Sequence, residues 1–143
     1  MQRHSKNLPG ETEPEPLFLT LAEAIEIHDY QIGHFGGTDG LRSIELLKSA
    51  IGMPSSTFAG KYLHPTIPEM AAAYLFHLAG NHPFLDGNKR IGAMAALVFL
   101  ELNGYELNAS DDEFTRLVMQ VADGTLSKPE VVLFFQQHSM LQQ

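Results

Sequence analysis

Apolar residues recur along most of the chain with the three- and four-residue spacing of amphipathic helices, and capping residues mark where several of these segments begin. Thr20 and Glu23 form a capping-box pair in front of the first segment, which the pair Gly36-Gly37 ends. A second, shorter helical pattern covers residues 41–51. No segment alternates convincingly with a period of two, so the pattern predicts helices as the main element.

The second half of the chain repeats this arrangement. Capping-box pairs stand before three further apolar patterns: Thr66 with Glu69, Ser110 with Glu113, and Ser127 with Glu130. Another helix is predicted over residues 88–103, with Gly104 as its stop. Residues 53–66 fit no helical pattern and are interpreted as an extended loop or a short flap hairpin. The predicted fold class is therefore all-α, with about six helices and this short flap.

Length and composition favour one folded domain. A chain of 143 residues can bury a core of its own, and the domain is expected over residues 17–143. Residues 1–16 hold three prolines and almost no large apolar side chain, which predicts a flexible tail. Cysteine is absent, so disulfides and thiolate chemistry are excluded. The pattern shows neither a signal peptide nor a stretch long enough to span a bilayer, and a cytoplasmic protein without a membrane partner is expected.

The charge balance narrows the choice of partner. Nine basic and seventeen acidic residues give a net charge of −8. Proteins that grip a nucleic-acid backbone over an extended face are usually basic, so nucleic acid is not expected as a direct partner. Lys89 and Arg90 form a local positive island in this acidic chain. Such an island suits a small anionic ligand, for example a nucleotide.

The residues around that island form a candidate phosphate site. A helix that starts near Asn88 directs its free N–H groups and the positive end of its dipole into the preceding turn. Gly87 has no side chain, so a phosphate can approach the backbone there. Lys89 and Arg90 add fixed positive charge, and a guanidinium makes forked contacts with phosphate oxygens.

Two further residues of the run 82–90 suggest chemistry on the phosphate. Asp86 would repel an anionic ligand unless a Mg²⁺ ion lies between them, and one carboxylate plus phosphate oxygens is a usual magnesium arrangement. His82 titrates near neutral pH and can take a proton from an attacking hydroxyl. Each residue alone also has a structural interpretation as a turn, a cap or a solvated face. Their joint occurrence in this order favours a site.

The run from His82 to Arg90 resembles the signature of the Fic family, histidine–x–phenylalanine–x–acidic–glycine–asparagine–x–arginine, at every defined position. More narrowly, it is similar to the death-on-curing (Doc) branch, the toxin half of toxin–antitoxin pairs. The resemblance covers most of residues 17–136 and implies an all-helical fold. It also implies transfer of part of a nucleoside triphosphate to a protein hydroxyl, with ATP as substrate and Mg²⁺ as cofactor.

The resemblance assigns a role to each residue of the motif. It implies that His82 is the general base and that Asp86 binds Mg²⁺. Gly87, Asn88 and Arg90 are implied to hold phosphates. The remaining motif position, Lys89, is a glycine in adenylyl-transferring members and a lysine in Doc-type toxins, whose prototype moves the γ-phosphate of ATP to a threonine of elongation factor Tu. Gly87 departs from that prototype and matches the general Fic form, so adenylyl transfer stays as the alternative to phosphoryl transfer.

The resemblance also concerns partners. The target segment is expected to dock at the flap within residues 53–66, and a small antitoxin is expected to inhibit in trans because the chain carries no self-inhibiting motif. A catalytically weak binding partner inside an antitoxin complex is a further alternative, which the complete motif disfavours. Of the other histidines, His28 and His77 are interpreted as structural. The spacings from His28 to His34 and from His77 to His82 do not fit the i, i+4 pairing of a helical zinc site.

Overall fold

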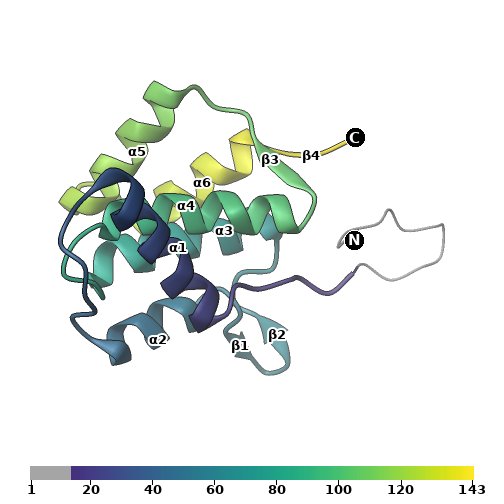
Figure 1. The fold of residues 1–143 in the computed structure, drawn as a ribbon. Coiled ribbons are helices and arrows are strands. Elements are labelled where there is room, and N and C mark those ends of the chain that lie inside the picture. The colour runs from purple at the N-terminus through teal and green to yellow at the C-terminus, as the bar shows by residue number, and fades with distance from the viewer. Residues whose placement is uncertain (1–13) are drawn as a thin grey trace.

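The computed structural model describes residues 14–143, so most of the predicted tail over residues 1–16 lies outside the described part. The fold has six helices and two small strand pairs. In Figure 1 the other helices surround a central pair, and the strand pairs lie at the periphery. The helices are α1 (Leu21–Phe35), α2 (Ile44–Gly52), α3 (Ile67–Asn81), α4 (Asn88–Leu102), α5 (Asp111–Asp123) and α6 (Lys128–His138). The predicted fold class is confirmed. No helix within residues 14–143 has both the length and the apolar character needed to cross a bilayer.

The central pair is the helical hairpin of α3 and α4, and small residues bring its two backbones close together. A Cβ on Gly92 would lie 3.2 Å from the carbonyl oxygen of Leu75 and 3.3 Å from the amide nitrogen of Ala79. Ala95 and Ala96 continue this narrow face of α4 and are fully buried. Close backbone packing leaves little freedom for one helix to slide on the other. The turn between α3 and α4 is therefore mounted on a rigid base.

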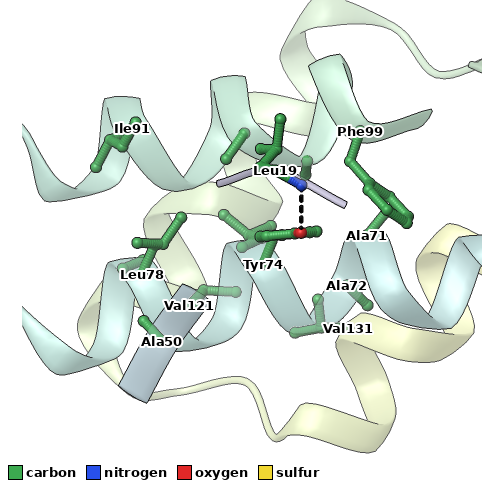
Figure 2. Close-up of a cluster of buried hydrophobic side chains, with 14 of the residues drawn as sticks. Leu19, Ala50, Ala71, Ala72, Tyr74, Leu78, Ile91, Phe99, Val121 and Val131 are labelled. Atoms are coloured by element: carbon green, nitrogen blue, oxygen red, sulfur yellow. Dashed lines mark hydrogen bonds between the residues drawn. The ribbon is translucent and has the colours of Figure 1, made fainter. Parts of the chain in front are cut away.

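The other elements cover this pair with apolar side chains. Figure 2 shows Tyr74 of α3 in the middle of the cluster, beside Phe99 of α4, with Val131 of α6 close by. The Tyr74 hydroxyl accepts a hydrogen bond of 2.9 Å from the amide of Leu19, just before α1. Burial raises the pKa of Tyr74 to about 12, so the hydroxyl stays protonated. This bond ties the start of the folded domain to its core.

Most predicted helix boundaries are confirmed because local side chains set them. Complete capping boxes begin α1, α5 and α6 at Thr20, Ser110 and Ser127. At α3 the box is incomplete, because Glu69 accepts from the Thr66 hydroxyl rather than from the Thr66 amide. The second helix begins at Ile44 and not at residue 41, since Ser43 provides its N-cap.

Residues 53–66 contain a short hairpin, as predicted. Its strands β1 (Thr57–Phe58) and β2 (Lys61–Tyr62) pair antiparallel, and the hairpin leads into the N-terminal end of α3. A second strand pair was not predicted: β3 (Tyr105–Leu107) pairs antiparallel with β4 (Ser139–Leu141). A strand of three residues is too short to show a period-two pattern in the sequence. This pair fastens the C-terminal end of the chain beside the end of α4.

Candidate active site

The site is built on the motif loop, residues 82–87, between α3 and α4. His82 ends α3 in the left-handed conformation, with φ +51°. Pro83 disfavours the right-handed helical conformation for the residue before it, so α3 cannot continue through His82. Gly87 opens α4 with φ +80°, a conformation that suits glycine. The two ends of the loop are thus fixed by backbone conformations that redirect the chain.

The connector, residues 36–43 between α1 and α2, holds the first half of the motif loop. The amides of Arg42 and Ser43 donate to the carbonyl of Pro83, at 2.8 and 3.0 Å. The amide of Leu85 donates to the carbonyl of Gly40 at 3.0 Å. The Arg42 side chain adds two bonds, from Nε to the carbonyl of His82 at 2.6 Å and from Nη2 to that of Asn81 at 2.9 Å. The loop therefore depends on residues about forty positions earlier.

The connector also holds the carboxylate of Asp86. The amides of Thr38 and Gly87 donate to its two oxygens, at 3.0 and 2.8 Å. These two bonds, that from Thr38 first, keep the pKa of the Asp86 carboxyl below its usual range, so the group is ionised at neutral pH. A Cβ on Gly37 would lie 2.8 Å from Asp86 Oδ2, so only glycine leaves room for this arrangement.

His28 of α1 contacts the second half of the motif loop. Its side chain is 1 % exposed, and its Nε2 donates to the carbonyl of Asp86 at 2.8 Å. Its ring stacks on Phe84 with 3.7 Å between centroids and 7° between planes. The interpretation of His28 as structural is confirmed, but its partners are the motif residues themselves. No local signal in the sequence indicated this, because 58 positions separate His28 from Asp86.

The remaining motif residues differ in what their side chains contact. Asn88 exchanges two hydrogen bonds of 3.0 Å with the backbone of Phe84, so its amide braces the loop. Lys89 Nζ lies 3.6 Å from the sulfur of Met119 in α5. Arg90 donates to the carbonyl of Gly36 at 3.2 Å and covers the ring of Phe35 at 5.8 Å. The two cations thus reach from α4 towards α5 and α1.

These residues surround one cleft of about 640 Å³. All the residues predicted for the site line it: His82, Asp86, Gly87, Asn88, Lys89 and Arg90. The end of α1 contributes Phe35 to Gly37, and the end of α5 contributes Ala122 and Asp123. In Figure 1 the ends of α1, α3 and α5 and the start of α4 meet on the same side of the molecule. The cleft is large enough for a nucleotide and open to solvent.

The donor set of the cleft fits a magnesium ion. Asp86 is exposed and ionised, and each of its oxygens keeps a lone pair beyond its single backbone bond. One carboxylate beside groups that bind phosphates is the arrangement that Mg²⁺ uses in nucleotide sites. His82 is also exposed and lines the same cleft, so its imidazole can reach a substrate hydroxyl there.

The hairpin lies elsewhere. None of the residues that line the cleft comes from 53–66. The hairpin enters α3 at its N-terminal end, whereas His82 follows the C-terminal end, and a helix of 15 residues is about 22 Å long. Figure 1 accordingly shows β1 and β2 away from the meeting point of the helix ends. A target that docks on the hairpin must therefore extend along the molecule to reach His82.

Comparisons with known proteins point to one family. A family model described as "Fic/DOC family" matches residues 18–100. The chain is similar to "Toxin Doc" of Mycolicibacterium smegmatis, with 42% identity over 78 residues, which cover 54% of this chain and 60% of that protein. It is also similar to "Protein kinase doc" of Escherichia phage P1, with 32% identity over 109 residues, which cover 76% of this chain and 85% of the phage protein. The match thus spans less than two thirds of the mycobacterial relative.

Proposed function

Since the chain belongs to the Fic/DOC family, we propose that it is a Doc-like toxin that transfers the γ-phosphate of ATP to a serine or threonine hydroxyl of a target protein. The proposed target is elongation factor Tu, whose modification would block translation. The observation that carries the proposal is the shared cleft, in which an exposed imidazole, an ionised carboxylate and two cations lie around one helix N-terminus.

In the proposed reaction His82 acts as the general base. Its imidazole accepts the proton of the target hydroxyl while the hydroxyl oxygen forms a bond to the γ-phosphorus. The bond between the γ-phosphorus and the bridging oxygen breaks, and ADP leaves with the electron pair. The products are a phosphorylated target, ADP and a proton that His82 then returns to solvent.

Cationic and amide groups of the cleft are proposed to stabilise the charge of the transferring group. Lys89, Arg90 and the amides at the start of α4 would bind the phosphate oxygens, since they line or adjoin the same cleft. A Mg²⁺ ion held by Asp86 would neutralise part of the charge on the transferring and leaving phosphates. The hydrogen bonds of Thr38 and Gly87 keep the Asp86 carboxylate oriented for this purpose.

Phosphoryl transfer is preferred to adenylyl transfer for two reasons. The phage relative that spans most of the chain is named a protein kinase. Gly87, the residue that pointed towards the general Fic form, has a backbone reason to be glycine, because its φ is +80°. Its identity therefore bears little on which phosphate is transferred.

The test is transfer to purified elongation factor Tu from ATP labelled at either the α- or the γ-phosphate. Label from the γ-position alone is the expected result. His82→Ala is expected to lower the rate by about 10²–10⁴-fold, the usual contribution of a general base. Label from the α-position would replace the proposal by adenylyl transfer. Absence of both labels, with toxicity intact in cells, would exclude this target or this nucleotide.

The target is proposed to use two surfaces. Its hydroxyl must enter the cleft, while the hairpin at the other end of α3 offers an anchor with Phe58 76 % exposed. A target long enough to contact both would gain affinity at the hairpin without changing the chemistry. This division predicts that hairpin variants alter the KM for the protein target and leave the KM for ATP unchanged.

An antitoxin segment is proposed to bind in trans along the groove between α1 and α4. Two adjoining hollows of about 360 and 320 Å³ follow this groove, and they share Gln31 and Met94. The second hollow includes Phe35 and Arg90, which also line the cleft. A segment that fills the groove would therefore cover Arg90 and block the phosphates. Met94→Glu should weaken neutralisation by the antitoxin while transfer stays at the wild-type rate.

A further inference from the structure

Three successive carbonyl groups at the end of α3, those of residues 81–83, accept hydrogen bonds from a single neighbouring residue. The carbonyl of Asn81 accepts from Arg42 Nη2 at 2.9 Å, and that of His82 accepts from Arg42 Nε at 2.6 Å. The carbonyl of Pro83 accepts from the main-chain amide of Arg42 at 2.8 Å. Arg42 lies in the connector and belongs to neither helix that the motif loop joins.

The chemistry of this contact is specific to arginine. Carbonyls at the end of a helix have no partner within the helix, and they attract positive charge. Because His82 is in the left-handed conformation, the chain leaves the helical path there, and the carbonyls of Asn81 and His82 do not continue the helical pattern. A guanidinium donates from Nε and from one Nη as a planar fork, so it can bind two such oxygens at once, whereas a lysine donates from a single point.

The contact also reaches the backbone of the proposed base itself. The side chain of His82 is exposed and lines the cleft, so its direction is set mainly by the conformation of its own backbone. The bonds from Arg42 fix the peptide planes on both sides of the His82 Cα. If they were absent, Pro83 would still exclude the right-handed helical conformation but would allow an extended one. An extended His82 would direct its imidazole elsewhere.

We propose that Arg42 is the positioning residue for His82: its guanidinium fork holds the left-handed conformation that directs the imidazole into the cleft. The role of His82 as base rests on the proposed function, but the effect of Arg42 on the His82 conformation does not. Arg42 itself does not line the cleft, so its substitution is expected to leave ATP binding unchanged.

The alternative is that Arg42 only stabilises the end of α3. The two roles predict different results, because residues 70–75 of α3 are buried in the core and do not depend on Arg42 for their packing. A purely stabilising role would lower the melting temperature and leave the kcat of the folded enzyme unchanged. A positioning role would lower kcat at temperatures where the variant is fully folded.

The kinetic experiment compares Arg42→Gln, Arg42→Lys and the matched control Arg116→Gln, which changes an exposed arginine of α5. Arg42→Gln is expected to lower the kcat for transfer at least tenfold, because small misplacements of reacting groups have effects of that order. The KM for ATP should stay within about twofold. Arg42→Lys should recover only part of the rate, and Arg116→Gln should match the wild type. An Arg42→Gln variant with wild-type kcat would overturn the proposal.

A second measurement tests the geometry without requiring activity. The ¹³Cα and ¹³Cβ NMR shifts of His82, assigned by loss of its signals in His82→Asn, report the backbone conformation of this residue. In the wild type they should indicate a left-handed conformation, and in Arg42→Gln they should move towards extended values while signals of the α3 core stay in place. Unchanged shifts in Arg42→Gln would overturn the proposal even if kcat fell. If the wild type transfers no phosphate, the proposed function fails and the shifts alone decide the role of Arg42.

Discussion

The two short non-helical segments beside α3, the hairpin at its start and the motif loop at its end, are held in different ways. The hairpin depends mainly on its own strands, on a hydrogen bond between Tyr62 and Glu15, and on contact of the rings of Tyr62 and Phe18. The motif loop is bonded to the connector and to α1 at almost every residue. The motif loop is proposed to perform chemistry, which needs fixed geometry, whereas the hairpin is proposed to recognise a partner and can tolerate change.

Removal of the carboxylate from the motif loop is expected to have the largest effect. Asp86→Asn keeps the shape of the side chain but removes the charge that is proposed to bind Mg²⁺. Transfer should fall by at least about a hundredfold, a loss typical of removing one charge-stabilising group. Its dependence on Mg²⁺ concentration should become weak. The measurement is the initial transfer rate over a Mg²⁺ titration, and wild-type dependence in the variant would contradict the role of Asp86.

Gly37→Ala is expected to have the second largest effect, because it disturbs the motif loop only through the connector. The new Cβ would lie 2.8 Å from Asp86 Oδ2 and must displace the carboxylate. A loss of about 10–100-fold in apparent Mg²⁺ affinity is expected, the range for residues that orient a metal ligand.

Gly36→Ala provides a matched control for this prediction. Gly36 also has a positive φ, of +84°, so alanine introduces similar backbone strain, but its Cβ would have no neighbour within 4 Å. Equal losses in the two variants would show that strain, and not contact with Asp86, is responsible.

Acid should lower the stability of the fold through two histidines, in and just before α3, and through Asp86 of the motif loop, at different pH values. His64 follows β2 and lies near His77 and Lys128. Burial is the main cause that lowers the pKa of His64, and it lowers that of His77 to about 4, with the charge of Lys128 adding to both effects. The unfolded chain takes up these protons near pH 6.5, so the free energy of unfolding should fall as the pH drops from 6.5 towards 4.

The pKa of Asp86 is lowered instead, so its contribution to stability is present above its unfolded value near 3.8 and is lost only below it. Urea unfolding at several pH values tests the difference. His77→Gln should flatten the decline between pH 6.5 and 4. Asp86→Asn should be less stable than the wild type above about pH 4, and this difference should disappear at lower pH. An unchanged decline in His77→Gln would show that other groups cause it.

The smallest effect is expected from the hairpin. Phe58→Ser removes an exposed aromatic side chain, so the free energy of unfolding should stay within about 0.5 kcal/mol of the wild type. The kcat and the KM for ATP should not change, whereas the KM for the protein target should rise. A fall in kcat equal to that of a loop variant would remove the distinction between the two regions.

The sequence predicted the elements that local chemistry determines. Ser110 and Ser127 cap their helices through neighbours three positions away, and Gly104 ends α4 by its own conformation. The motif residues were found for the same reason, since they are contiguous. Their supports were not predicted, because His28 and Arg42 reach the loop over 58 and 40 positions and each reads locally as an ordinary helix or loop residue. The packing of α1 against α4 and of α2 against α3 brings them to the loop.

The stacking and hydrogen bonding of the His28 ring affect where inactivating substitutions are expected along the sequence. One imidazole supports Phe84 and Asp86 at once, and the neighbouring connector supports His82. In a selection for cells that escape the proposed toxicity, inactivating substitutions should therefore appear at two places on the gene, the codons of the motif and those of residues 28–43. The second group would look unrelated to the motif in a linear map, although in the folded protein both groups damage the same loop.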